Sequence, residues 1–193
     1  WIALAQAAQI SLLDLQTGQT KAALEYLPIS THTEYYYIPV IEWLADGSAF
    51  QTTVPPDDPV IRPEDPSAIW RVTASTGKAG QLGQVFMGFQ AQRAYFSPDG
   101  TRLAYQHRYA LDGPVTIFIT QVDGGETRQV MSGLFDLNGW APGGGSLLIY
   151  DRTARQSLSL SLDGQLSPLL SFGVILGGQP LVYRPLEQGL ASQ

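Results

Sequence analysis

Short apolar segments alternate with turns along most of the chain, and apolar residues do not recur at helical spacing. Three segments share one order: an aromatic residue, a tight turn that contains Gly, and a second apolar segment. They cover residues 43–50, 96–105 and 140–150. In the middle copy Pro98 presets φ for a turn, Asp99 bonds backbone groups ahead of it, and Gly100 adopts positive φ without strain. The pattern predicts an all-β chain of repeated hairpins with little or no helix.

The spacing of the repeat indicates the architecture. The aromatic residues Trp43, Phe96 and Trp140 are 53 and 44 residues apart, close to the length of a propeller blade. We therefore expect a β-propeller of four-stranded blades with about four blades present, the first of which lacks its first strand. The predicted blades cover residues 1–27, 36–83, 91–131 and 134–170, and a closing or next-blade strand covers 174–184.

Two arrangements of these blades remain open. The chain forms a single propeller domain if its last strand completes the first blade in a four-bladed ring. Alternatively, the chain is a fragment of a longer propeller. Both of its ends fall near the same strand of a blade, as an arbitrary cut through a longer ring would leave them. The fragment is slightly favoured, because unpaired inner edges would otherwise need protection.

Composition and charge exclude several kinds of partner. The 193 residues carry a net charge of -6 with only 11 Lys and Arg, whereas nucleic-acid binding needs clustered basic residues. Adhesion to an anionic membrane is disfavoured for the same reason, and no apolar stretch approaches the length of a membrane span. Cysteine is absent, so disulfides and thiol chemistry are excluded.

The segment Phe96-Ser-Pro-Asp-Gly100, with the later Asp123-Gly-Gly125, resembles the Pro-Asp-Gly propeller repeats of TolB-like proteins. Similar repeats occur in the propeller domains of prolyl-oligopeptidase-type peptidases. The resemblance implies a WD40-like β-propeller, a periplasmic or extracellular location in bacteria, and a surface that binds other proteins. Two copies depart from the pattern, with Ala45 in place of Pro98 and Gly143 in place of Asp99. Nothing resembles the separate α/β domain of TolB, so its tethering role is not implied.

Catalytic motifs are weak. The segment Gly144-Gly145-Ser146 lacks the final glycine of a nucleophile elbow, and residues 75–78 lack the first glycine and the Ser or Thr of a P-loop. We therefore expect no enzymatic activity and no cofactor. The aromatic residues of the repeat are interpreted as core residues wedged between sheets rather than as ligand-stacking groups.

Metal binding is also disfavoured. The two histidines are far apart in sequence, and the proline-rich segment 55–67 carries four acidic residues without a calcium-binding register. This segment is interpreted as a solvated acidic loop, and calcium binding there stays open.

The two faces of such a propeller differ. One holds the tight turns, and the other, here called the loop-rich face, holds the longer connections at 30–35, 55–66, 106–113 and 151–156. Long loops on a rigid scaffold commonly carry function, and Tyr and Arg dominate protein interfaces. The candidate partner-binding residues are His32, Tyr35, His107, Arg108, Tyr109, Arg152 and Arg155.

The functional hypothesis is a non-catalytic scaffold that binds a protein partner of unknown identity through this face. The plain alternative is that these loops are merely hydrophilic. Two other functions stay open: the propeller portion of a larger serine hydrolase of prolyl-oligopeptidase type, gating substrate, and a structural subunit of a larger assembly.

Overall fold

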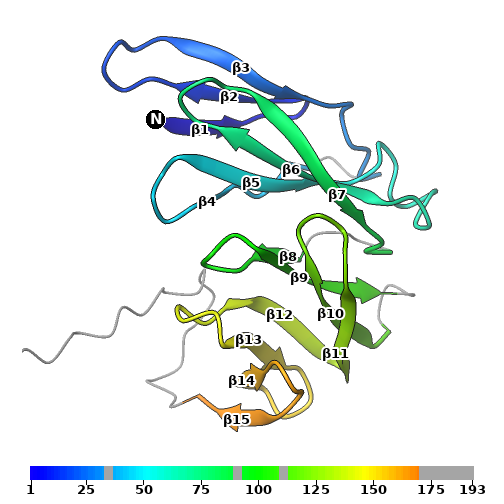
Figure 1. Ribbon diagram of the computed structural model, residues 1–193. Helices are drawn as coiled ribbons and strands as arrows, with labels where there is room; N and C mark the ends of the chain where they lie inside the picture. Colours follow the sequence, from blue (N-terminus) through cyan, green and yellow to red (C-terminus); the bar gives the residue numbers. More distant parts are fainter. Residues whose placement is uncertain (33–36, 89–92, 109–112, 170–193) are drawn as a thin grey trace, which may run out of the picture.

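The computed structural model describes residues 1–32, 37–88, 93–108 and 113–169, and these residues form β-strands and connections without a helix (Figure 1). The first sheet has three strands, β1 (Ile2–Ala5), β2 (Gln9–Leu13) and β3 (Thr20–Glu25). The second has β4 (Glu42–Trp43), β5 (Ala49–Val54), β6 (Ser67–Thr73) and β7 (Ala79–Val85). The third has β8 (Ala94–Phe96), β9 (Arg102–Arg108), β10 (Val115–Gln121) and β11 (Thr127–Gly133). The fourth has β12 (Phe135–Trp140), β13 (Ser146–Asp151), β14 (Gln156–Ser161) and β15 (Leu166–Pro168).

Each sheet is an antiparallel meander in which neighbouring strands are consecutive in sequence. The sheets follow one another in a row, with the blue first sheet at one end and the yellow and orange fourth sheet at the other (Figure 1). The described sheets do not close into a ring. The arrangement is therefore all-β and has the organisation of consecutive propeller blades, as the repeat predicts.

The tight turns form because Asp and Gly satisfy the backbone at the same two positions in successive blades. The Asp46 carboxylate accepts from Ser48 N at 2.9 Å, and the Asp99 carboxylate accepts from Thr101 N at 3.0 Å. Gly47 and Gly100 both have φ of 68°, a value that residues with a Cβ adopt only with strain. The predicted hairpin turns are confirmed.

The hydrophobic core consists of three clusters, one at each boundary between consecutive sheets. Ile10 and Phe50 are fully buried between the first and second sheets, and Ile69 is fully buried between the second and third. Leu137 and Ile149 are fully buried against β9 and β10. Burying each such side chain contributes roughly 1.5–3 kcal/mol, so the stability of the chain comes mainly from packing sheets face to face.

Polar contacts also cross the boundaries between sheets. Lys21 Nζ of the first sheet donates to Ser75 O of the second at 2.9 Å. The Gln106 side-chain oxygen of the third sheet accepts from Leu137 N of the fourth at 3.1 Å. These hydrogen bonds join side chains of one sheet to backbone of the next and so fix how the sheets sit on each other.

Two sequence predictions differ from the structure. The predicted inner strand 36–43 is reduced to β4, because Pro39 cannot donate to a ladder; the Thr52 hydroxyl instead donates to Val40 O at 2.7 Å. Phe96 is buried as expected, but Trp43 is 37% exposed and is not a core residue. The predicted strand at 174–184 lies outside the described residues.

Candidate functional site

The loop-rich face is built from the connections that the meander places opposite the tight turns. In the four-stranded sheets these are the segment between the second and third strands and the segment that leads to the next sheet; in the three-stranded first sheet they are the β1–β2 connection and the segment after β3. Tyr35 and Tyr109, two of the candidate residues, lie outside the described residues. The other five are placed as follows.

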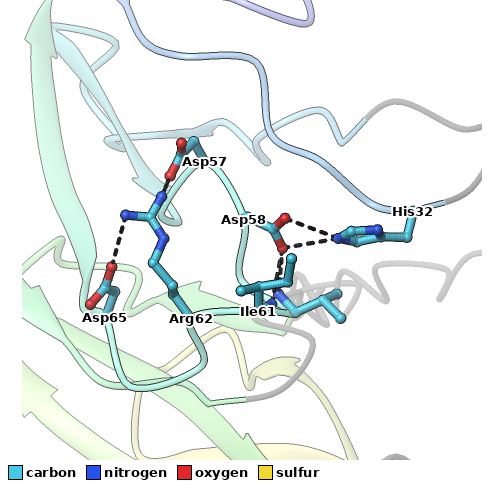
Figure 2. Close-up of polar contacts among 7 residues, drawn as sticks. His32, Asp57, Asp58, Ile61, Arg62 and Asp65 are labelled. Carbon is cyan, nitrogen blue, oxygen red and sulfur yellow. Dashed lines mark hydrogen bonds and ion pairs between the residues drawn. The ribbon is translucent and has the colours of Figure 1, made fainter.

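His32 is paired with the acidic loop. Its Nε2 lies 3.0 Å and 3.1 Å from the two carboxylate oxygens of Asp58 (Figure 2). His32 has φ of 54°, an unusual backbone conformation for a residue with a Cβ. The pKa of Asp58 is held below its usual value by hydrogen bonds, first from the Ile61 N–H and then from His32. His32 therefore connects two segments of this face.

The acidic loop also contains its own basic residue. The Arg62 guanidinium contacts the carboxylate of Asp57 and lies 3.4 Å from that of Asp65 (Figure 2). Arg62 therefore contacts two of the loop's carboxylates and His32 contacts a third, while the Arg62, Asp57 and Asp65 side chains stay 41–45% exposed. Over the ranges that the structure describes, no three His, Asp or Glu side chains gather as a metal site.

His107 and Arg108 end β9 and are half-buried. The His107 ring centroid lies 6.4 Å from that of Phe118, and burial lowers the pKa of His107. Arg108 Nη2 lies 3.9 Å from a carboxylate oxygen of Asp136 on β12. Because their side chains are only 13% and 21% exposed, this pair lies at the boundary between the third and fourth sheets rather than in a solvated loop.

Arg152 and Arg155 flank the turn after β13 and differ in environment. Arg152 Nη2 donates to Gly113 O at 3.3 Å, and its backbone N–H donates to Leu134 O at 3.0 Å. Arg155 is exposed and has φ of 54°. The structure thus brings Arg108 and Arg152 to one boundary between sheets, places His32 on the acidic loop, and leaves the Arg155 side chain in solvent.

The loop-rich face also carries exposed apolar side chains, which the sequence analysis did not identify. Each connection that leaves the last strand of a sheet carries one, within two residues of the strand end. We call this set the apolar row: Leu27, Phe86, Leu134 and Leu169, which are 69%, 57%, 44% and 37% exposed. Ile61 in the acidic loop is 67% exposed. Their exposure could have been predicted from the sequence, because an apolar residue directly after the outer strand of a blade has no sheet to cover it.

The weak hydrolase motif lies away from the histidines. Ser146 begins β13 beside a tight turn, and its hydroxyl oxygen lies 2.9 Å from that of Ser159 on β14. His107 lies at the end of β9 and His32 in the connection after β3, both on the loop-rich face. The geometry therefore does not assemble these three residues into a nucleophilic site. In the described part of the chain, no helix is long and apolar enough to cross a membrane.

The sequence matches no protein-family model and no curated protein. Solved structures do match. TolB from Acinetobacter baumannii shares 17% sequence identity over 89% of this chain, with a TM-score of 0.57. The acylaminoacyl peptidase of Pyrococcus horikoshii shares 17% over 87%, also with a TM-score of 0.57. A chain of the nidogen–laminin complex shares 17% over 85%, with a TM-score of 0.52.

The chain spans only part of each of these proteins: 41% of the TolB chain, 30% of the peptidase and 59% of the nidogen–laminin chain. At such identities the likeness concerns the fold. It agrees with the resemblance carried by the Pro-Asp-Gly turn. The described residues therefore have the fold of consecutive β-propeller blades, as in TolB and in peptidases that carry propeller domains.

Proposed function

We propose that this protein is a non-catalytic β-propeller that binds a protein partner through its loop-rich face. The observation that carries the proposal is the apolar row. Exposed large apolar side chains are costly to leave in water, and when they gather on one face they commonly mark an interaction surface. On the tight-turn face, the turn between β2 and β3 carries the exposed Leu15, which provides a comparison.

The candidate basic residues take different parts in this proposal. Arg108 and Arg152 contact the neighbouring sheet or its connections, and His32 contacts Asp58, so these three hold the face in shape. Arg155 is exposed and is available to a partner directly. Arginine is a residue type that is enriched in the energetically dominant part of protein interfaces.

The location of the protein outside the cytoplasm is part of the same proposal. It rests on the resemblance to TolB-like propellers. A scaffold role is favoured over a catalytic one because Ser146 begins β13 beside a tight turn, whereas both histidines belong to the loop-rich face of other sheets.

The test removes the apolar row and leaves the fold intact. The double substitution Phe86→Ser with Leu134→Ser is compared with Leu15→Ser, which changes a leucine on the other face that is 63% exposed. Immobilised proteins are exposed to extract from the source organism, and bound proteins are quantified. Two lost interface anchors correspond to at least about tenfold weaker capture.

The proposal expects the Leu15 variant to retain the partner that the wild type captures and the double variant to lose it. Equal retention by both variants, or equal loss, would contradict it. Circular dichroism checks that all three proteins melt alike, as exposed substitutions should.

A further inference from the structure

The boundary between the third and fourth sheets holds an arginine that contacts only neutral oxygen atoms. Arg93 directly precedes β8 and is half-buried, and its backbone carbonyl accepts from Gln106 N on β9 at 3.1 Å. Its Nη1 donates to Leu137 O at 3.1 Å and to Asn138 Oδ1 at 2.9 Å. Both acceptors belong to β12, which lies beside β8 across this boundary (Figure 1). The guanidinium is therefore held in place against the fourth sheet by uncharged partners.

The carboxylates nearest to this arginine along β12 and β4 have other partners. Asp136 lies 3.9 Å from Arg108, and Glu42 accepts from Phe96 N at 3.1 Å. Among the residues that the structure describes, none of the ion pairs includes Arg93. Charges removed from water are usually paired with an opposite charge, so this half-buried cation lacks the anion that would complete its site.

Its side-chain acceptor, Asn138, lies at a break in the strand pairing. The register of β12 against β13 passes from Leu137 directly to Gly139. Asn138 is thus the extra residue of a β-bulge, which locally disrupts the ladder. It is also the sole asparagine of the 193 residues, and a glycine follows it. The site therefore combines an asparagine outside the ladder, a glycine and a cation.

An Asn-Gly pair undergoes deamidation without an enzyme. The backbone nitrogen of Gly139 loses its proton to water and attacks Cγ of Asn138, and the new C–N bond replaces the bond to the side-chain nitrogen, which takes a proton from water and leaves as ammonia. Water then opens the resulting succinimide to a carboxylate. The ring closure is favoured because both groups belong to one chain. Glycine places no Cβ in the path of the attack, and even a Cβ here would come no closer than 3.8 Å to Tyr95.

We propose that Asn138 is a site of spontaneous deamidation that Arg93 promotes, and that the aspartate formed there pairs with Arg93. The attack places negative charge on Asn138 Oδ1, the atom to which Arg93 already donates. A donor fixed in advance at a developing oxyanion lowers the barrier. The product then adds a negative charge to a hydrogen bond whose donor is already ionised, which strengthens it. Because the two residues belong to different sheets, the reaction tightens the boundary between them.

The test follows the reaction in the purified full chain, which is incubated at pH 8, digested and examined by mass spectrometry. The peptide that contains position 138 should gain the mass that separates a carboxyl group from an amide, with release of an equal amount of ammonia. Arg93→Gln should slow this gain at least about threefold, and Arg93→Lys, which keeps the charge, should slow it less. No gain in the folded protein, or an equal or faster gain in the Gln variant, would overturn the proposal.

A control in urea separates the effect of the fold from that of the sequence. Gly139 is paired with Leu148 in the folded chain, so its nitrogen reacts when this pair opens locally. In urea Arg93 no longer faces position 138, and the wild type and both Arg93 variants should react at one rate. A rate that still depends on residue 93 in urea would contradict the role assigned to the folded contact.

The substitution Asn138→Asp tests the product directly. It should raise the urea midpoint of the wild type, because the new carboxylate faces Arg93. In the Arg93→Gln background the same substitution should leave the midpoint unchanged or lower it, since the carboxylate then lacks a cation. An equal effect in the two backgrounds would refute the pairing.

Discussion

The indole N–H of Trp140 donates to the backbone carbonyl of Tyr95 at 2.8 Å. Trp140 ends β12, the first strand of the fourth sheet, and Tyr95 lies in β8, the first strand of the third. The aromatic residue that marks each repeat therefore does more than fill space at this boundary. It fixes one sheet against the backbone of the next, and the ring also meets the Arg102 guanidinium.

The first prediction concerns this hydrogen bond. Trp140→Phe keeps a ring at the boundary but leaves the Tyr95 carbonyl without its donor. We expect the free energy of unfolding to fall by about 1–2 kcal/mol, measured by urea denaturation. Trp1→Phe, at an exposed position, is the control and should change it by less than about 0.5 kcal/mol. Equal effects of the two substitutions would show that the hydrogen bond does not stabilise the boundary.

The second prediction separates backbone strain from crowding in the repeated turn. Gly47 and Gly100 share φ of 68°, but a Cβ at Gly47 would meet nothing within 4 Å, whereas one at Gly100 would lie 2.3 Å from Leu44 Cδ2. Gly47→Ala should cost about 1 kcal/mol from strain alone. Gly100→Ala should cost about 2–3 kcal/mol, since Leu44 must also move. Urea denaturation of both variants gives the comparison, and identical losses would contradict the close packing.

The third prediction concerns pH. Burial raises the pKa of Glu42 from 4.5 to about 7, so the folded state holds a proton that the unfolded state releases. The contribution of Glu42 to stability is then most favourable below about pH 4.5 and falls by about 2–3 kcal/mol as pH rises to 7. Beyond pH 7 it should change little further.

Glu42→Gln should remove this fall. Burial lowers the pKa of His107, so protonation of His107 reduces stability as pH falls below its ordinary pKa. This effect is opposite to that of Glu42, so the wild type and the Gln variant are compared with each other at every pH. Denaturation curves at pH 4.5, 6 and 7.5 measure the difference. A constant difference across this range would show that Glu42 does not titrate there.

The fourth prediction distinguishes the two kinds of arginine on the loop-rich face. Arg108 lies half-buried beside Asp136, so Arg108→Ala should lower the free energy of unfolding by about 1–2 kcal/mol. Arg155→Ala removes an exposed side chain and should change it by less than about 0.5 kcal/mol. Thermal melts of both variants provide the measurement. A larger loss at Arg155 than at Arg108 would reverse the roles assigned here.

Local chemistry made most of the fold predictable. Asp-Gly turns such as Asp99-Gly100 fix the hairpins, and alternating apolar residues fix which side of each strand is buried, so strand positions follow from short-range rules. The inner strand of the second sheet did not follow, because its length depends on how β5 pairs beyond Pro39. The exposure of Trp43 was also unpredictable, since it depends on side chains that a different sheet brings near it.

The candidate site was harder to predict for the same reason. Arg108 and Arg152 belong to loops in the sequence, but their partners Asp136 and Gly113 come from other strands and connections, so only the fold reveals that they are engaged. The hydrogen bond that the Glu42 carboxylate accepts depends likewise on Phe96, whose backbone N–H donates from 54 residues away. By contrast, Phe86 and Leu134 follow outer strands directly, and their exposure could be predicted from the strand ends.

Photocrosslinking at the apolar row tests partner binding through the loop-rich face most directly. Phe86→p-benzoylphenylalanine and Leu15→p-benzoylphenylalanine place the same reactive group on opposite faces of one protein. In extract from the source organism, irradiation should give a single protein adduct at position 86 that excess unlabelled wild-type protein suppresses, and none at position 15. The same adduct at both positions, or an adduct at position 15 alone, would contradict the account.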